Sequence, residues 1–172
     1  MVLAPRTTCR RIRRLRYEDL DLIAGWDKDP EISRLTGRMA HEQGALETWW
    51  NDMTRDGSRV DFAITDNEGQ VIGDVALEQI IWRTREAELR IAIGNKDYWG
   101  YGYGTQAVRE VVELGFTGMN LDRIYLRVQH DNVRAIRSYL KAGFRKVARL
   151  VANGRLEGTA DLLLMEMHRM EA

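Results

Sequence analysis

A segment in the middle of the chain joins a strand-like pattern to closely spaced glycines. It reads Glu88-Leu-Arg-Ile-Ala-Ile-Gly-Asn-Lys-Asp-Tyr-Trp-Gly-Tyr-Gly-Tyr-Gly-Thr105. We expect a strand, a loop containing Gly100, Gly102 and Gly104, and a helix that begins at about Thr105. Glycine admits backbone conformations closed to other residues, and amides of such a loop at a helix N-terminus attract anions. The segment predicts a phosphate-binding loop, although a flexible glycine turn is equally compatible with the glycines alone.

A second group of residues with chemical potential lies on one predicted helix. Asn132, Ala135 and Tyr139 share a stripe, so the Tyr139 hydroxyl can face a cleft. We expect an apolar core stripe about 100° away, formed by Val133, Ile136 and Leu140. Taken singly, Tyr139 is also compatible with an ordinary half-buried tyrosine and Asn132 with a turn or cap residue.

Two common phosphate loops do not fit the glycine segment. A P-loop ends in Gly-Lys-Ser/Thr, but Gly104 is followed directly by Thr105. A dinucleotide fold needs G-x-G-x-x-G early in the chain and an acid near the end of the next strand, whereas the spacing here is G-x-G-x-G and Asp122 precedes its strand.

Together the two blocks resemble the GNAT superfamily of acyl-CoA-dependent N-acyltransferases. The R/Q-x-x-G-x-G/A loop and the N-x-x-A-x-x-x-Y-x-x-x-G-F helix occur in the family's order between Glu88 and Phe144. Trp99-Gly-Tyr-Gly-Tyr-Gly-Thr-Gln-Ala107 is similar to the version in RimJ/RimL-type N-terminal acetyltransferases and polyamine acetyltransferases. The resemblance implies an α/β (α+β) fold: a mixed, mostly antiparallel sheet of six to seven strands, with splayed central strands and helices on both faces.

The resemblance also assigns an acetyl-CoA site. The loop from Trp99 would bind the coenzyme, with its pyrophosphate on the amides of Tyr101, Gly102, Tyr103, Gly104 and Thr105, preceded by Gly100. The pantetheine arm would pair with the strand at Ile91, Ala92 and Ile93. Asn132 would contact the thioester end, and Tyr139 would protonate the departing thiolate.

The loop departs from the family pattern at two positions. Trp99 stands where Arg or Gln is usual, and Tyr101 replaces a common Lys or Arg. Both changes weaken the expected electrostatic hold on the coenzyme. Arg134 could supply the missing cation, the alternative being a solvated charge on the helix surface.

A basic group near the amine would assist the reaction. An unperturbed lysine, with a pKa of about 10.4, costs about 4.6 kcal/mol to deprotonate at pH 7. An α-amine costs only about 1–1.4 kcal/mol. Several GNAT members carry a base about fourteen residues before the central loop glycine. Glu88 occupies that position before Gly102, and we expect it to act through a water; the alternative is an exposed strand glutamate.

The resemblance favours a protein or peptide α-amine as acceptor. The alternatives are a small-molecule amine, such as a polyamine or antibiotic, and a non-catalytic acyl-CoA sensor, although a sensor has no need of an acid such as Tyr139. Acceptor selection in this superfamily lies in the first two helices and the late hairpin, which here contain Trp26, Trp49, Trp50, Arg34, Arg38, Trp82 and residues 153–157.

The remaining pattern predicts one domain over residues 1–172. Expected strands are 11–16, 61–65, 71–82, 86–93 and 123–129, with a hairpin formed by 144–151 and 159–168. Expected helices are 18–26, 42–55, about 105–119, and one from an Asp131 cap to Gly143, while 30–41 is predicted to be irregular.

Composition narrows the function classes. Lys+Arg 26 and Asp+Glu 26 cancel, which argues against a nucleic-acid or membrane-surface partner. The single cysteine, Cys9, cannot form an internal disulfide, and the three histidines lie in no metal-ligand spacing, so we expect no metal. No signal-like segment occurs, and a cytoplasmic location is expected. We leave the oligomeric state open, with a homodimer as one candidate.

Overall fold

The computed structural model describes residues 10–40, 44–151 and 161–170. Its strands are β1 (Ile12–Arg14), β2 (Val60–Thr65), β3 (Val71–Ile81), β4 (Glu86–Ile93), β5 (Arg123–Gln129), β6 (Arg145–Leu150) and β7 (Leu162–His168). Its α-helices are α1 (Leu20–Asp27), α2 (Pro30–Thr36), α3 (Leu46–Arg55), α4 (Tyr103–Glu113) and α5 (Val133–Ala142). Short 3₁₀ turns η1 (Tyr17–Asp19) and η2 (Lys96–Tyr98) and a π-helical turn η3 (Leu114–Gly118) complete the elements.

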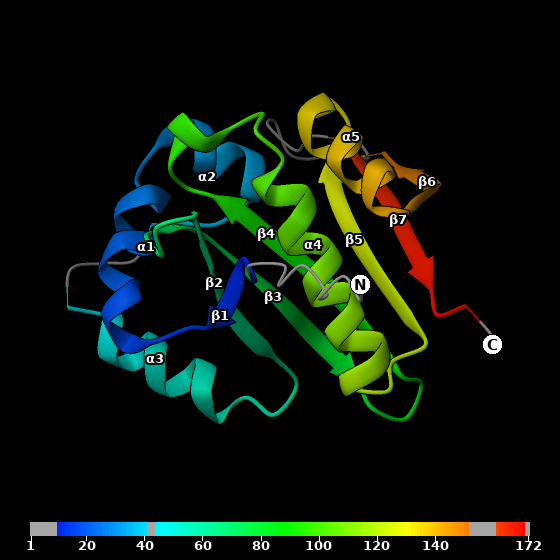
Figure 1. The fold of residues 1–172 in the computed structure, drawn as a ribbon, viewed down its shortest axis with the longest axis horizontal. Coiled ribbons are helices and arrows are strands. Elements are labelled where there is room, and N and C mark those ends of the chain that lie inside the picture. Colours follow the sequence, from blue (N-terminus) through cyan, green and yellow to red (C-terminus); the bar gives the residue numbers. More distant parts are fainter. Residues whose placement is uncertain (1–9, 41–43, 152–160, 171–172) are drawn as a thin grey trace, which may run out of the picture.

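The strands form a seven-stranded sheet in the order β1-β2-β3-β4-β5-β7-β6 (Figure 1). All neighbouring pairs are antiparallel except β4 and β5, which run parallel. The pairing of β4 with β5 ends at Glu88 opposite Tyr125, although both strands continue. The mixed, mostly antiparallel sheet with splayed central strands is therefore confirmed.

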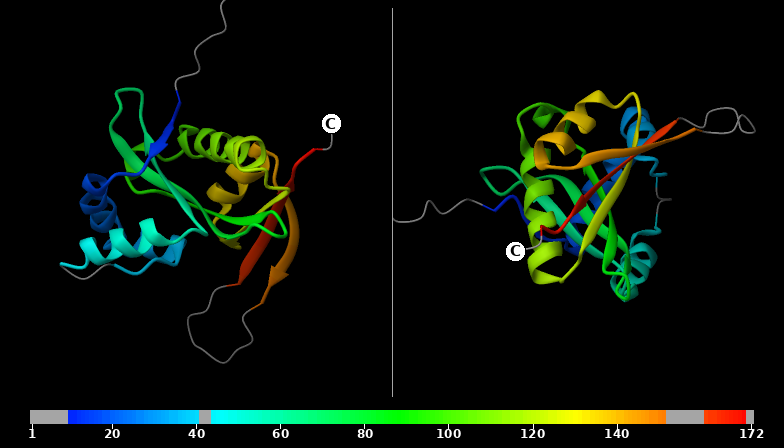
Figure 2. Two further views of the ribbon diagram at one scale, coloured as in Figure 1. Left: turned by 90° about the horizontal axis from the view of Figure 1, so that it is seen from below. Right: turned by 90° about the vertical axis from the view of Figure 1, so that its right-hand side faces the viewer.

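Helices cover both faces of the sheet, as expected. Figure 2 shows α4 on one side and the α1–α3 group on the other. Strand residues that alternate toward α4, such as Val75, Leu89 and Ile124, are buried with the α4 residues Val108 and Val111. This apolar layer is the main core and holds α4 against the sheet.

The sequence analysis predicted residues 30–41 to be irregular and therefore missed α2. The Asp29 side chain accepts hydrogen bonds from the amides of Glu31 and Ile32, and Pro30 occupies the first turn. The helix ends at Gly37, whose φ of 70° is typical of a C-terminal glycine. An Asp-Pro start followed by a glycine stop was the available signal.

The orientation of α5 also differs from the prediction. Ile136 and Tyr139 are buried, but Val133 and Leu140 are 52% and 45% exposed, so their assignment to the core was wrong. Small side chains explain this rotation, because Ala135 and Ala142 pack toward the core and allow a close approach. The helix is capped by Asn132, which accepts a hydrogen bond from the Ala135 amide, and not by Asp131.

Several expected boundaries shift by a few residues. The first helix is divided between η1 and α1, α3 begins at Leu46, and α4 begins at Tyr103 before turning into η3 at Leu114. Strands β6 and β7 pair antiparallel as the predicted hairpin. The predicted hairpin turn lies outside the described residues.

Candidate active site

The glycine loop between η2 and α4 presents a row of backbone amides. Gly100 and Gly102 have φ values of 84° and 87°, a region that side chains disfavour, and Gly102 immediately precedes α4. The first helical hydrogen bond runs from the Gln106 amide to the Gly102 carbonyl. Within the described chain, the amides of residues 100–105 donate to no other backbone group. These donors and the positive end of α4 fit a pyrophosphate.

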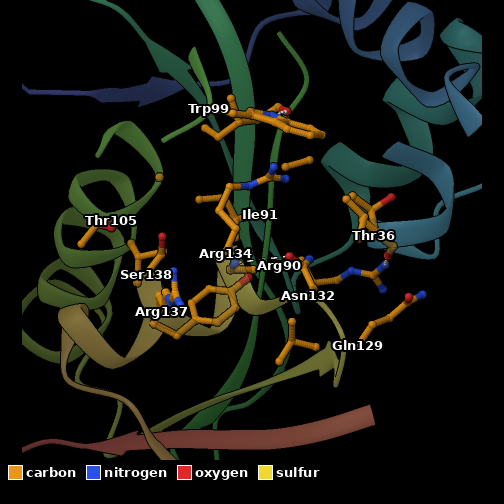
Figure 3. A pocket seen from close by; sticks show the side chains of 18 of the residues that line it. Thr36, Arg90, Ile91, Trp99, Thr105, Gln129, Asn132, Arg134, Arg137 and Ser138 are labelled. Carbon is orange, nitrogen blue, oxygen red and sulfur yellow. Dashed lines mark hydrogen bonds between the residues drawn. The ribbon is translucent and has the colours of Figure 1, made fainter. Parts of the chain in front are cut away.

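Trp99 is fixed at the entrance of this loop. Its indole Nε1 donates to the carbonyl of Ile93, at the end of β4, over 2.8 Å. The guanidinium of Arg134 lies 3.4 Å from the centroid of the Trp99 ring. Figure 3 shows the two side chains next to each other in the pocket. Burial lowers the pKa of Arg134, but arginine remains charged at neutral pH. A cation is therefore held where the family pattern has its own arginine or glutamine.

Two further cations follow Arg134 along α5. Arg137 and Lys141 line the same pocket as Arg134, together with Thr105 and Val108 from α4. Their spacing of three and four residues puts them on one side of the helix. The groove between α4 and α5 is therefore basic, which suits the phosphates of a coenzyme.

The groove between α4 and α5 adjoins the split between β4 and β5, the gap where these two strands cease to pair. Past Glu88, the edge of β4 that includes Ile91 and Ile93 has no paired strand on the β5 side among the described residues. The ring of Tyr139 is buried against Phe144, with a 6.0 Å centroid distance, while the residue lines the pocket. Burial raises the pKa of the Tyr139 phenol well above its usual value, so the hydroxyl stays protonated at neutral pH.

The opposite face of the split is charged. Both carboxylate oxygens of Glu88 accept from Arg127, at 2.9 Å from Nε and 2.7 Å from Nη2. Arg90 donates to Glu78 at 3.2 Å and to the carbonyl of Thr36 at 3.1 Å. These residues alternate with the apolar ones along β3, β4 and β5, so they face away from α4.

Arg38, just beyond α2, anchors a second charged group on this face. Its guanidinium lies 2.6 Å from Asp74 and 2.9 Å from Asp27, whose side chain is fully buried. Burial opposes the charge of Arg38, but Asp74 and Asp27 outweigh it and raise the pKa of the guanidinium above its usual value. The three groups tie α1 and the segment after α2 to β3.

One pocket of about 650 Å³ connects the two faces. Its lining comes from the glycine loop and the facing sides of α4 and α5, from β4 and the end of β5, and from α2 and residues 37–38. In Figure 3, Thr105, Ser138 and Arg137 lie on one side of the split, and Thr36 and Gln129 lie on the other. A long donor can enter from the α4/α5 side and an acceptor from the α2 side.

Most residues predicted to bind the coenzyme line this pocket. They are Ile91, Ala92, Ile93, Trp99, Gly100, Gly102, Tyr103, Gly104, Thr105 and Asn132, joined by Tyr139 and Glu88. Tyr101 is not among them: its side chain is 77% exposed and borders a neighbouring hollow on the outer side of the loop. Asn132 lines the pocket while its Oδ1 caps α5, which leaves its amide group as a donor for a ligand.

Among the residues predicted to select the acceptor, Arg38 lines the pocket. Trp26 instead packs on Gly94, where a Cβ would lie 2.0 Å from the indole. Trp50 contacts Tyr17 edge-on, and Trp82 donates to the carbonyl of Gly57.

Arg34 bonds to Gln129 and Asp131, connecting α2 to the end of β5, while Trp49 is half-buried and outside the pocket lining. Residues 153–157 lie outside the described residues.

Comparisons with known proteins agree with this geometry. Residues 10–145 match the family described as "Acetyltransferase (GNAT) domain". The chain belongs to the GNAT acetyltransferase family. As a GNAT acetyltransferase, it is an acetyl-CoA-dependent N-acetyltransferase that acetylates an amine.

Several similar GNAT proteins are spermidine acetyltransferases. Spermidine N(1)-acetyltransferase of Escherichia coli K12 is 31% identical over 135 residues, 78% of this chain and 72% of that protein. The crystal structure of spermidine N-acetyltransferase from Vibrio cholerae with CoA and spermine has a TM-score of 0.83 and 27% identity, covering 91% of this chain and 94% of that one. A dodecameric structure of the Vibrio cholerae enzyme is also similar, with a TM-score of 0.78, 26% identity and coverage of 91% and 92%.

The GNAT resemblance is thus confirmed at the level of the family. The Escherichia coli and Vibrio cholerae relatives are polyamine acetyltransferases, so the narrower RimJ/RimL assignment has no support from them. Sequence reasoning also missed Arg90, Arg127 and Arg137 as pocket residues. Alternation along β4 and β5 put Arg90 and Arg127 on the polar face, but not beside the split.

Two other kinds of feature are absent from the residues that the structure describes. They contain no helix with the length and apolar character needed to cross a membrane. They also contain no cluster of three or more His, Cys, Asp or Glu side chains suited to a metal ion.

Proposed function

We propose that this enzyme transfers the acetyl group of acetyl-CoA to a small-molecule primary amine by direct attack, without a covalent enzyme intermediate. The observation that carries the proposal is the continuous pocket through the β4/β5 split. It joins the amide-rich loop at the start of α4 to a polar face reached from the α2 side. Such a passage lets two substrates meet from opposite sides of one sheet.

The coenzyme side follows from charge and backbone geometry. In this proposal the amides of residues 101–105 hold the pyrophosphate, helped by Arg134 on Trp99. Hydrogen bonds to charged oxygens contribute about 1.5–3 kcal/mol each, so several amides give firm binding. The unpaired edge at Ile91 to Ile93 receives the pantetheine arm, and the free amide group of Asn132 contacts its end.

Two side chains handle protons in the proposed reaction. Glu88 is the carboxylate among the described lining residues, and each of its oxygens keeps a second lone pair beyond its bond to Arg127. Glu88 accepts the amine proton through a water as the nitrogen attacks the carbonyl carbon. The Tyr139 hydroxyl gives its proton to the sulfur as the carbon–sulfur bond breaks.

The choice of a small amine rests on the relatives. The spermidine acetyltransferases of Escherichia coli and Vibrio cholerae act on a small amine, which favours that class over the peptide α-amine implied by the RimJ/RimL resemblance. A peptide N-terminus remains the second candidate because the sequence of the glycine loop is similar to that group.

Thiol release from acetyl-CoA over a panel of amines tests the proposal. The panel contains spermidine, short alkyl amines, amino acids and short peptides. Turnover of a small amine supports it, and turnover of peptides alone supports the second candidate. CoA binding without turnover of any amine contradicts both and indicates a sensor.

The same assay tests the proton donor. Tyr139→Phe should lower turnover about 10–1000-fold, the range of general acid catalysis, with little change in CoA affinity. Tyr17→Phe is the control, because Tyr17 contacts Trp50 and does not line the pocket. Unchanged turnover in Tyr139→Phe would remove Tyr139 from the mechanism.

A further inference from the structure

The acceptor side of the pocket presents guanidinium groups to an incoming molecule. Arg38, Arg90 and Arg127 all line the pocket on the face opposite α4. The side chains of Arg90 and Arg127 are 40% and 42% exposed, whereas that of Arg38 is 21% exposed. Figure 3 shows Arg90 between the split and Thr36 of α2.

The carboxylates on this face lie behind the arginines. Glu88 is 4% exposed and holds Arg127 with both oxygens. Glu78, Asp74 and Asp27 are 15%, 17% and 0% exposed, and none of them lines the pocket in the described part of the chain. An acceptor therefore meets the cations first, and each of these carboxylates is already in contact with an arginine.

The arginines retain hydrogen-bonding capacity. A guanidinium has five N–H donors, and the described residues accept two hydrogen bonds from Arg90 and two from Arg127. The anchored planes of these groups match the oxygens of a carboxylate or a phosphate, which they bind in pairs. A polyamine, in contrast, would bring its remaining positive charges toward this surface.

We propose that the acceptor is a primary amine whose other end carries an anionic group, a carboxylate or a phosphate, and that Arg90 selects it. This inference rests on the proposed function and names its substrate class. It would distinguish this chain from the spermidine acetyltransferases of Escherichia coli and Vibrio cholerae by its acceptor.

A matched set of amines tests the proposal directly. Putrescine and γ-aminobutyrate share a four-carbon chain and one amine, and differ in whether the other end is cationic or anionic. Butylamine is the neutral reference, and 3-aminopropyl phosphate separates phosphate recognition from carboxylate recognition. The readout is kcat/KM for each amine, measured by thiol release at saturating acetyl-CoA.

We expect the wild-type enzyme to prefer an anionic member of the set over putrescine by at least about tenfold. Arg90→Gln should reduce that ratio about tenfold, because it removes a charge-assisted contact while keeping a polar side chain. Arg59→Gln is the matched control: Arg59 lies near the same Glu78, at 3.8 Å, but does not line the pocket, so the ratio should be unchanged.

The outcomes separate this inference from the proposed function. Preference for putrescine over both anionic amines overturns the inference and leaves the proposed function standing. An anionic preference that survives Arg90→Gln overturns the role of Arg90. Absence of turnover with all four amines overturns this inference, and it overturns the proposed function as well only when spermidine and the other small amines of the wider panel also fail.

Discussion

The two sides of the split are built by different means. On the α4/α5 side, the groups available to a ligand are mainly backbone amides, placed by glycines within a single loop of the sequence. On the α2 side, they are side chains brought together from distant segments: Arg127 meets Glu88 across 39 positions, and Arg38 meets Asp74 across 36.

This difference explains why the two proposed substrate sites are unequally visible in the sequence. A loop that binds through its backbone needs particular residue types at fixed spacing, so its function is visible locally. On a charged face, the register of the strands decides which charged side chains become neighbours. The effect on a ligand then depends on which of these charges are exposed to the pocket. The coenzyme can therefore be shared by a family while the acceptor changes.

The largest expected effect comes from breaking the backbone side at Gly102. Gly102→Val forces a β-branched residue into a φ of 87°, so the loop must rearrange and its amides diverge. Losing two charge-assisted hydrogen bonds corresponds to about 3–6 kcal/mol, so acetyl-CoA should bind at least about 100-fold more weakly by calorimetry.

Gly69→Val is the matched control for backbone strain. Gly69 has a φ of 84° in the turn between β2 and β3, and a Cβ there, as at Gly102, would meet nothing within 4 Å. Both variants should lose similar folding stability, about 1–3 kcal/mol, but Gly69→Val should bind acetyl-CoA normally. Tight binding by Gly102→Val would contradict the loop assignment.

The sequence was sufficient for the sheet, the glycine loop and the family, because those depend on alternation and on a motif. It was insufficient for α2, whose seven residues are too few for a clear period and are instead defined by Asp29 and Gly37 at its ends. It also misjudged α5, because an alternative stripe containing Ala135 and Tyr139 turns inward.

The charged acceptor side was the least predictable part of the site. Glu88 was identified as a candidate base, but its bidentate pair with Arg127 depends on the parallel register of β4 against β5. Arg90 and Arg127 were visible only as polar positions on alternating strands. Their position beside the split depends on where the pairing of β4 with β5 ends. No local sequence pattern predicts that end point.

A smaller effect is expected where a side chain supports the backbone side. Arg134→Ala should raise the KM for acetyl-CoA about 5–20-fold, which corresponds to about 1–2 kcal/mol, and leave kcat nearly unchanged, because it removes a cation beside the loop. Trp99→Leu should have part of the same effect, and the double variant should be less than additive, because the indole holds the guanidinium at 3.4 Å.

Arg109→Ala is the control, because it removes an exposed cation from α4 outside the pocket and should leave the KM for acetyl-CoA unchanged. Full additivity would show that Trp99 and Arg134 act independently.

The last expected effect concerns folding stability on the charged side, and it is lost in acid. Glu166 on β7 contacts Arg123 of β5 at 2.8 Å, Arg145 of β6 at 2.7 Å and His168 at 3.2 Å. Hydrogen bonds from Arg123, opposed by burial and aided by Arg145 and His168, lower the pKa of Glu166 to about 2. Because the folded pKa lies below the unfolded one, this stabilisation is complete above about pH 4.5 and is lost as the pH falls toward 2. Its size is at most about 3 kcal/mol.

Glu166→Gln should therefore unfold more readily than wild type in urea at pH 6, and the difference should shrink as the pH falls to about 2. Glu113→Gln, an exposed carboxylate on α4 without an ion pair to a described residue, should show no such convergence. A stability difference for Glu166→Gln that is constant with pH would mean that packing, and not charge, holds β5, β6 and β7 together on this face.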